Sequence, residues 1–251
     1  MNSDDEGKMS AGIAACKFVS NGMNLGLGTG STVYYTIIEL GRMIAEEGLE
    51  IAGMPTSKAT ALLAQKVGIP LLNWSEVETL DLVIDGADEV DGDFQLIKGG
   101  GGALTREKIV ANIGAAMVVV ADPRKDVTVL GEFPLPVEIL PFGWESTFRH
   151  LQNLCEGDVT IRRSPEVPAF ELDGEKIDVN EHGGPFVTDN GNLIADCNFG
   201  ATIDNPIELE SDILGIPGVV EVGLFNDMCD VLIIGSSAGV EVRMRRGGRL
   251  S

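Results

Sequence analysis

Apolar runs of strand length alternate with helical patterns through the first half of the chain. The strand-like runs are short and almost continuously apolar, whereas the longer segments between them repeat their apolar positions at helical spacing. In chain order, the expected strands and helices cover residues 24–27, 32–47, 50–54, 58–67, 81–84, 104–113 and 116–121. Alternation of this kind is typical of βαβ units and predicts an α/β fold with a parallel sheet.

The pattern changes beyond Pro134-Leu135-Pro136. One helix is expected near residues 146–155, and several short strand-like pieces are separated by turn residues such as Asp189-Asn190-Gly191. We therefore expect a smaller α/β domain in this part of the chain. The apolar runs 216–220 and 231–234 are expected to return to the main sheet, and the basic ending 243–249 is expected to be a frayed tail.

Length and composition fit a globular protein with one large domain, or with a large and a small one. The chain has 251 residues, of which 44% are hydrophobic, and no stretch approaches the roughly 20 apolar residues of a membrane helix. The polar start lacks the features of a signal peptide, so we expect a cytoplasmic location and no membrane partner. The four cysteines are scattered and are expected to be buried, reduced thiols, and two histidines are too few for a histidine-based metal site.

The net charge of −21 argues against a nucleic-acid partner, because phosphates would be repelled. Most of the acidity is expected to be a solvated surface, which fits adaptation to high salt and ordinary acidic composition equally well. In such a protein an anionic ligand would need locally concentrated cations. The lysines near glycine-rich loops, Lys8, Lys98 and Lys125, are the candidates.

A glycine-rich loop at residues 26–32 joins the first expected strand to a helix. Free backbone N–H groups and the positive helix end can bind an anion at such a junction, and the hydroxyls of Ser31 and Thr32 can add donors. A plain glycine turn capped by Ser or Thr explains the loop equally well. The third glycine of a dinucleotide fingerprint would fall at Ser31, and no G-K-[ST] follows, so neither nucleotide-binding motif is present.

Four ionisable residues lie close together in the sequence among glycines: Asp85, Asp88, Lys98 and Glu107. Asp85 ends an apolar strand, where ligands bind in open α/β sheets. The four glycines that follow Lys98 are costly in backbone entropy and indicate a close approach of backbone to a ligand. Such a set can open a sugar ring, hold an oxyanion and move a proton.

Simpler interpretations exist for parts of this set. The acidic stretch after Asp88 suits a solvated turn, whereas a calcium loop fails on spacing, because Gly100 stands where the terminal glutamate would be. Glu107, in the first turn of a helix, would also stabilise the positive helix end by roughly 0.3–1 kcal/mol without any catalytic role.

Three motifs in order, D-G-A-D-E at 85–89, I-K-G-G-G-G-A-L-T-R-E-K at 97–108 and F-P-L-P-V-E at 133–138, resemble those of the ribose-5-phosphate isomerase A family. Further similar stretches lie at 26–32, 55–57, 131–141, 187–192 and 216–225. The resemblance implies a Rossmann-like main domain at 1–134 and 208–251, with a smaller, ferredoxin-like α/β domain at 135–207. It also implies a homodimer or homotetramer and catalysis with no metal and no cofactor.

The activity implied by this resemblance is the interconversion of D-ribose 5-phosphate and D-ribulose 5-phosphate through an enediolate, in the non-oxidative pentose phosphate pathway. By motif, the general base falls on Glu107. Asp85 is implied as the main proton relay in ring opening with Asp88 as helper, and Lys98 as the group that stabilises the oxyanion. The implied substrate-binding residues are Lys8, Thr29, Gly30, Ser31, Thr32, Asp85, Gly86, Ala87, Asp88, Lys98, Gly99, Gly100, Gly101 and Lys125.

The chain departs from the family pattern in three places. Pro123 and Arg124 stand where a small or acidic residue and a serine are usual, the segment 164–183 is longer than expected, and the basic ending is unfamiliar. Other functional classes also remain open: a non-enzymatic sugar-phosphate sensor, an acyl-CoA transferase with a glutamate nucleophile, and an aldose-ketose isomerase for a different sugar phosphate.

Overall fold

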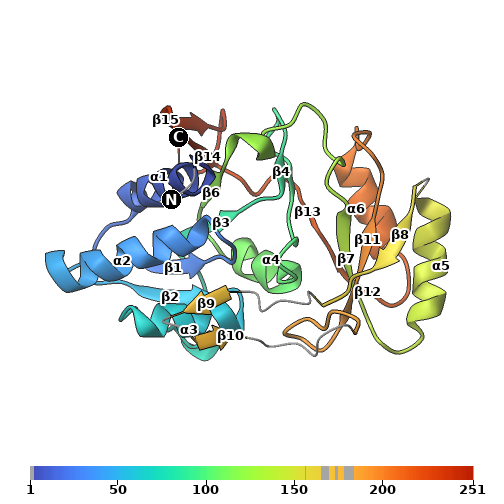
Figure 1. The fold of residues 1–251 in the computed structure, drawn as a ribbon, viewed down its shortest axis with the longest axis horizontal. Coiled ribbons are helices and arrows are strands. Elements are labelled where there is room, and N and C mark those ends of the chain that lie inside the picture. The colour runs from blue at the N-terminus through green and yellow to red at the C-terminus, as the bar shows by residue number, and fades with distance from the viewer. Residues whose placement is uncertain (1–2, 156, 165–169, 173–174, 178–183, 251) are drawn as a thin grey trace.

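The main domain is built on a six-stranded sheet with helices on both faces (Figure 1). The computed structural model describes residues 3–155, 157–164, 170–172, 175–177 and 184–250. Only the pairing of β14 with β15 is antiparallel in this sheet, so the predicted α/β fold with a Rossmann-like, mostly parallel sheet is confirmed. In spatial order the strands are β15 (Gly239–Met244), β14 (Val231–Ser236), β6 (Met117–Ala121), β3 (Leu82–Gly86), β1 (Asn24–Leu27) and β2 (Ala52–Pro55).

Alternate residues of the inner strands β14, β6 and β3 enter two separate cores. In β6, Val118 and Val120 pack into the core beneath α1 and α2, whereas Met117 and Val119 pack into the core on the α4 side. The expected helices and strands of this half are therefore present, within two residues of their predicted ends. The helices of the main domain are α1 (Ser3–Ala15), α2 (Val33–Glu47), α3 (Lys58–Lys66) and α4 (Leu104–Asn112).

Helix α1, which the sequence pattern did not reveal, lies directly on β14. Gly7 and Gly235 make this contact, because a Cβ added to Gly7 would lie 2.6 Å from the carbonyl oxygen of Gly235. The reverse substitution would place a Cβ 2.1 Å from the Gly7 carbonyl oxygen. This close backbone approach fixes the position of Lys8, the next residue of the helix.

The smaller domain is a four-stranded antiparallel sheet with the β-α-β-β-α-β order of a ferredoxin-like fold, as predicted. The spatial order is β12-β7-β11-β8. The core of this domain includes Leu151 of α5 and Ile213 of α6. Its elements are β7 (Leu135–Ile139), α5 (Trp144–Leu154), β8 (Val159–Ile161), β11 (Leu193–Cys197), α6 (Pro206–Leu214) and β12 (Val219–Val222).

One strand lies in a different sheet from the one predicted. The run 216–220 was expected in the main sheet, but β12 pairs with β7 of the small sheet, with Val222 opposite Val137, so that expectation is wrong. The physical reason is that a short apolar run in the sequence predicts a strand but does not specify which strand it pairs with. The limits of the two domains stay a prediction, and this pairing favours a second limit after Val222 rather than at 207. The other predicted return, 231–234, is confirmed as β14.

The basic ending is not a frayed tail up to residue 250. Arg243 of β15 forms ion pairs with Asp126 and Glu241, both at distances below 3 Å. Arg249 lies 2.8 Å from Asp230, a carboxylate that is only 3% exposed. The arginines therefore fold against carboxylates of an acidic protein, a long-range pairing that the local sequence does not reveal.

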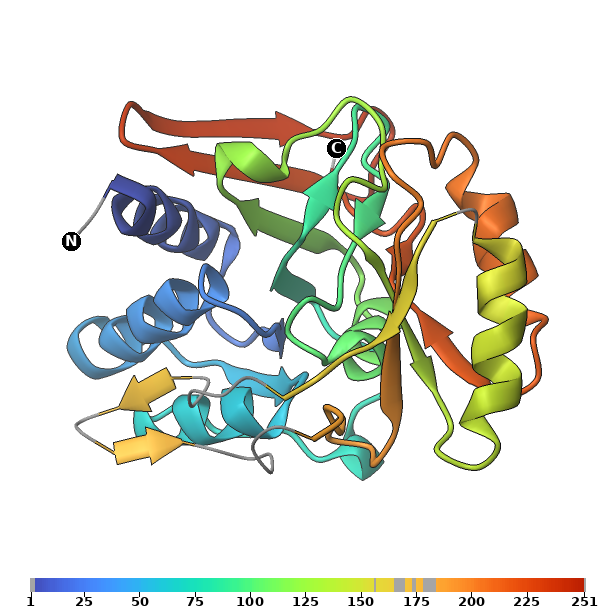
Figure 2. The same ribbon diagram turned by 45° about the vertical axis from the view of Figure 1, so that its right-hand side comes forward.

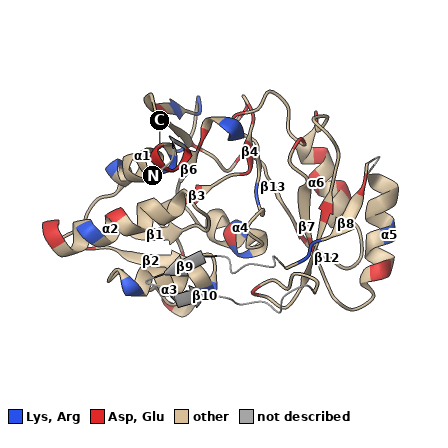
Figure 3. Cartoon of the chain, in the orientation of Figure 1, with Lys and Arg blue, Asp and Glu red and all other residues tan. Residues whose placement is uncertain are grey.

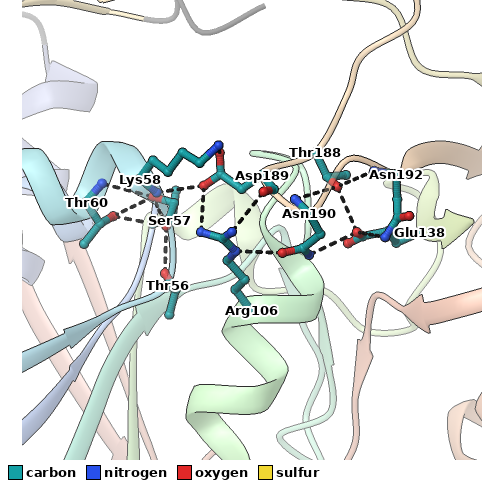
Figure 4. Close-up of polar contacts among 11 residues, drawn as sticks. Thr56, Ser57, Lys58, Thr60, Arg106, Glu138, Thr188, Asp189, Asn190 and Asn192 are labelled. Carbon is teal, nitrogen blue, oxygen red and sulfur yellow. Dashed lines mark hydrogen bonds and ion pairs between the residues drawn. The ribbon is translucent and has the colours of Figure 1, made fainter. Parts of the chain in front are cut away.

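Short strands connect the two domains, and a turn of the small domain docks on the main one (Figure 2). The three-stranded sheet β13-β5-β4 consists of β4 (Glu89–Val90), β5 (Leu96–Ile97) and β13 (Leu224–Phe225). The predicted turn at Asp189 and Asn190 lies between α3 and α4 (Figure 4), where Arg106 donates to Asn190 Oδ1 at 2.8 Å. The Lys58 N–H, in the first turn of α3, donates to Asp189 Oδ2 at 2.7 Å.

Of the segment 164–183, most residues lie outside the described part of the chain. Within it, β9 (Phe170–Leu172) and β10 (Glu175–Ile177) pair with each other as an antiparallel hairpin. Acidic positions occur on helices of both domains, including α2, α5 and α6 (Figure 3). Among the described residues, none of the helices has both the length and the apolar character needed to cross a membrane.

Candidate active site

The carboxyl ends of β1 and β3 bring the first glycine-rich loop against Asp85. Gly28 is required here, because a Cβ at this position would lie 2.1 Å from Asp85 Oδ1 and 2.6 Å from the Asp85 Cα atom. The backbone N–H of Thr29 donates to the same Oδ1 atom at 3.1 Å, and that of Gly86 does so at 2.7 Å. Asp85 is thus held by backbone donors on one side.

Three hydroxyl groups from the β2–α3 region hold the side chain of Thr29. Thr29 Oγ1 lies 2.7 Å from Thr56 Oγ1, 2.9 Å from Ser57 Oγ and 3.1 Å from Thr60 Oγ1. Figure 4 shows Thr56, Ser57 and Thr60. Sequence reasoning did not assign these three residues to the site, although the P-T-S motif at 55–57 contains two of them. The cluster fixes the loop where it turns toward the N-terminus of α2.

Lys98 forms a buried ion cluster with two carboxylates. Its Nζ atom lies 3.0 Å from Asp85 Oδ2 and 3.6 Å from Glu107 Oε1, and it donates a short hydrogen bond to the carbonyl of Gly86. All three charged side chains are at most 5% exposed. The structure therefore brings together three of the four predicted catalytic residues.

Burial controls the protonation of this cluster. Desolvation raises the pKa of Glu107 to about 8, with a further contribution from the negative charge of Asp85. For Lys98 desolvation acts in the opposite sense, but the carboxylates of Asp85 and Glu107 outweigh it and raise the pKa of the amine. Within the described part of the chain, Glu107 Oε2 has no hydrogen-bond partner. Glu107 is thus a buried carboxyl group with a raised pKa beside a fixed cation.

Asp88 lies between β3 and β4, closer to solvent, and contacts the second glycine-rich loop, residues 99–102. Its Oδ2 atom accepts a 2.7 Å hydrogen bond from the N–H of Gly100, and its Oδ1 atom lies 4.0 Å from the Lys125 Nζ atom. The loop turns at Gly99, where φ is +108°, a backbone conformation that favours glycine.

These groups surround a cavity of about 420 Å³. Of the predicted site residues, Asp85 lies beneath the lining, where it pairs with Lys98, and Gly100 lies beside it, where it binds Asp88. The predicted residues that line the cavity are Lys8, Thr29, Gly30, Ser31, Thr32, Gly86, Ala87, Asp88, Lys98, Gly99, Gly101, Glu107 and Lys125.

Arg124 also lines the cavity, although the sequence showed it only as a departure from the family pattern. Arg124 lines the cavity with Lys8 and Lys125, and it is held by Asp122 and Asp4, each at 2.9 Å. The loop around Lys125 is a short 3₁₀ turn that Asp122 caps by accepting from the N–H of Arg124.

Among the described residues, no group of three or more His, Cys, Asp or Glu side chains could hold a metal ion. The four cysteines, all within the described residues, are buried and none forms a disulfide, as predicted. Burial raises the pKa of Cys16 and Cys229 to about 12, which makes these thiols poor nucleophiles.

Comparison with known proteins identifies the family. The model of the family ribose 5-phosphate isomerase A (phosphoriboisomerase A) matches residues 52–239. The chain belongs to the ribose-5-phosphate isomerase A family. A ribose-5-phosphate isomerase A from Bacillus mycoides is 47% identical over 235 residues, which cover 93% of this chain and 97% of the relative.

Solved structures of the isomerase A family have the same fold over nearly the whole chain. The ribose 5-phosphate isomerase A of Methanocaldococcus jannaschii is 40% identical with a TM-score of 0.84, covering 96% of this chain and 100% of that one. A D-ribose-5-phosphate isomerase in complex with phospho-erythronic acid is 37% identical with a TM-score of 0.86, covering 98% and 100%.

Proposed function

We propose that this protein interconverts D-ribose 5-phosphate and D-ribulose 5-phosphate. The observation that carries the proposal is the buried Asp85–Lys98–Glu107 cluster, which lies beside a cavity that Lys8 and Lys125 also line. An enediolate reaction on a sugar phosphate requires a base, a fixed cation for the enediolate oxygen and further cations for the phosphate. Membership of the isomerase A family supports the same activity.

Ring opening needs a proton relay at the furanose oxygen and the anomeric hydroxyl. The contacts favour Asp88 for this step, because its carboxylate lines the cavity and is 21% exposed. Asp85 is 1% exposed, and its oxygens are engaged by Lys98 and by two backbone N–H groups. Asp85 therefore holds Lys98 in place. Its predicted role as the main relay stays a prediction.

Proton transfer between carbons is assigned to Glu107. Its carboxylate takes the proton from C2, the C–H electron pair forms a C1=C2 double bond, and the aldehyde oxygen gains the negative charge. While the carboxyl group holds this proton, the proton exchanges with solvent. Glu107 then delivers a proton to C1 as the C2 carbonyl forms, and the hydroxyl proton of O2 passes to O1. General-base catalysis of this kind contributes about 10²–10⁴-fold.

Lys98 and the backbone N–H groups of the second glycine-rich loop stabilise the enediolate oxygen. The ammonium group is buried and already fixed by Asp85, so it needs no reorganisation as charge develops. Lys8, Lys125 and the N-terminus of α2, which line the same cavity, suit a phosphate group. Binding energy from this remote group supports catalysis at the reacting carbons.

The direct test is turnover of ribose 5-phosphate by the purified protein in the presence of a chelator, at low and at high salt. We expect ribulose 5-phosphate to form, and ribose without its phosphate to react far more slowly. No conversion at either salt would contradict the proposal and favour a sugar-phosphate sensor or an acyl transferase. Faster reaction of another aldose phosphate would instead favour an isomerase for a different sugar.

The location and the assembly of the protein are also proposals. A cytoplasmic location and a homodimer or homotetramer stay predictions, as does catalysis with no metal and no cofactor. Light scattering on the purified protein measures the assembly directly, and a monomer would contradict that prediction.

A further inference from the structure

A single arginine of the small domain reaches the glycine-rich loop of the site. Arg162 follows β8 directly, and its Nη1 atom donates to the carbonyl oxygens of Gly99 and Gly100 at 2.7 and 3.1 Å. Its side chain is only 14% exposed. These two glycines follow Lys98 in the sequence, so the arginine holds the loop immediately next to the buried cation.

The guanidinium group is itself held in a fixed plane. Its Nε and Nη2 atoms donate to both oxygens of Asp196 on β11, at 2.9 and 2.5 Å. The group lies 6.0 Å from the ring centroid of Phe186, and this ring also covers Gly102, where a Cβ would meet it at 2.3 Å. A bidentate, stacked arginine of this kind is not replaceable by lysine without losing geometry.

Peptide geometry transmits this contact to the cavity. In a trans peptide the carbonyl oxygen and the following N–H point in opposite directions. Because Arg162 holds the oxygens of Gly99 and Gly100, the N–H groups of Gly100 and Gly101 point away from it. The first of these donates to Asp88 Oδ2 at 2.7 Å, and Gly101 lines the cavity. A run of four glycines has no side-chain preference that would hold this orientation by itself.

We propose that Arg162 is a positioning residue for the isomerase reaction: by holding two carbonyl oxygens from behind, it aims the loop's N–H donors at Asp88 and at the enediolate. The inference rests on the proposed function. It assigns the small domain a direct part in catalysis, because Arg162 and its partner Asp196 both belong to that domain.

The test compares Arg162→Met and Arg162→Lys with Arg149→Met, which removes an exposed arginine of the same domain. For Arg162→Met we expect kcat for ribose 5-phosphate to fall about 10- to 100-fold, the range expected when catalytic groups are misplaced by about 1 Å. KM should change far less, because the phosphate contacts lie elsewhere. Arg162→Lys should keep only part of the activity, and Arg149→Met should match the wild type.

A second readout separates positioning from a merely structural role. Phospho-erythronic acid has a carboxylate whose negative charge resembles that of an enediolate. Inorganic phosphate lacks this group and probes only the cations that suit a phosphate. Arg162→Met should weaken inhibition by phospho-erythronic acid much more than inhibition by phosphate. Added guanidinium at a non-denaturing concentration should restore part of the kcat of Arg162→Ala.

Several outcomes would overturn the inference. These are an unchanged kcat per folded molecule, a loss that follows only the unfolded fraction measured by circular dichroism, or equal weakening of both inhibitors. If Arg162→Met does not fold, Arg162→Lys and Asp196→Asn carry the same comparison. Failure of the wild type to convert ribose 5-phosphate would refute the proposed function instead. In that case direct binding of phospho-erythronic acid and of phosphate, measured by calorimetry, would still test the loop.

Discussion

The raised pKa of Glu107 predicts a steep dependence of the isomerase rate on pH. Burial raises this pKa to about 8, and the charge of Asp85 adds to the effect. A base acts only when ionised, so about a tenth of the free enzyme is competent at pH 7 and about nine tenths at pH 9. We therefore expect kcat/KM to rise about tenfold between these two values. Sugar phosphates are almost fully ionised above pH 7, so the substrate contributes little to this rise.

The assay is kcat/KM for ribose 5-phosphate from pH 6.5 to 9.5 at constant ionic strength. Asp88→Asn serves as an internal comparison, because the charge of Asp88 also raises the pKa of Glu107. In that variant the ascending limb should move to lower pH, although the rate itself falls. A profile that is flat between pH 7 and 9, or a limb below pH 6, would refute the reasoning.

The same proton also affects stability. Between 4.5 and about 8 the folded protein keeps a proton on Glu107 that the unfolded chain has lost. The contribution of this residue to the free energy of unfolding therefore falls as pH rises through that window. Denaturant unfolding of the wild type and of Glu107→Gln should diverge across this range, with the variant gaining relative to the wild type at higher pH. Parallel curves would contradict the assigned shift.

Three further substitutions test the packing of the site and of the domain contact. Gly28→Ala forces a Cβ to within 2.6 Å of the Asp85 Cα, so we expect the free energy of unfolding in denaturant to fall by about 1–3 kcal/mol. Gly92→Ala, at an open position, should be nearly neutral. Equal effects of the two substitutions would contradict the steric argument. Lys98→Met leaves two buried carboxylates without their cation, so we expect the free energy of unfolding at pH 9 to fall by about 3–5 kcal/mol. An unchanged unfolding midpoint at this pH would show that the cluster is not fully charged. Glu138→Ala removes a fully buried acceptor of four side-chain hydrogen bonds, which come from Thr105, Thr188, Asn190 and Asn192. These bonds tie β7 to α4 and to the turn at 188–192, so we expect the variant to have a lower thermal midpoint. A midpoint within 1–2 °C of the wild type, which corresponds to under about 1 kcal/mol, would show that these bonds do not hold the turn in place.

The main domain could be predicted from the sequence because its strands are buried on both faces. Residues 116–121 and 231–234 form continuous apolar runs that admit few other interpretations. The partner of a strand is a different matter, since pairing is decided by long-range packing. This is why the run 216–220 was assigned to the wrong sheet and why residues 243–244, the end of β15, were expected in a frayed tail.

The site could be located from the sequence because its chemistry lies in a few short motifs. Asp85, Lys98 and Glu107 do meet, which their closeness in the sequence suggested. The rule that ligands bind at the carboxyl ends of strands applied to Asp85, which stands near the end of β3. Arg162 had no local signal, because a single arginine after a short strand resembles any solvated cation. Its role depends on a carbonyl contact across the domain boundary, which only the folded chain shows.

The central claim is that Glu107 moves the proton between C2 and C1 of the sugar phosphate. The most direct measurement is turnover of ribose 5-phosphate in D₂O, with deuterium at C1 of the product followed by NMR, for the wild type and Glu107→Gln. We expect the wild type to turn over with deuterium incorporated at C1. We expect the variant to bind phospho-erythronic acid but to lose both turnover and exchange. Turnover and exchange close to those of the wild type in Glu107→Gln would contradict the account.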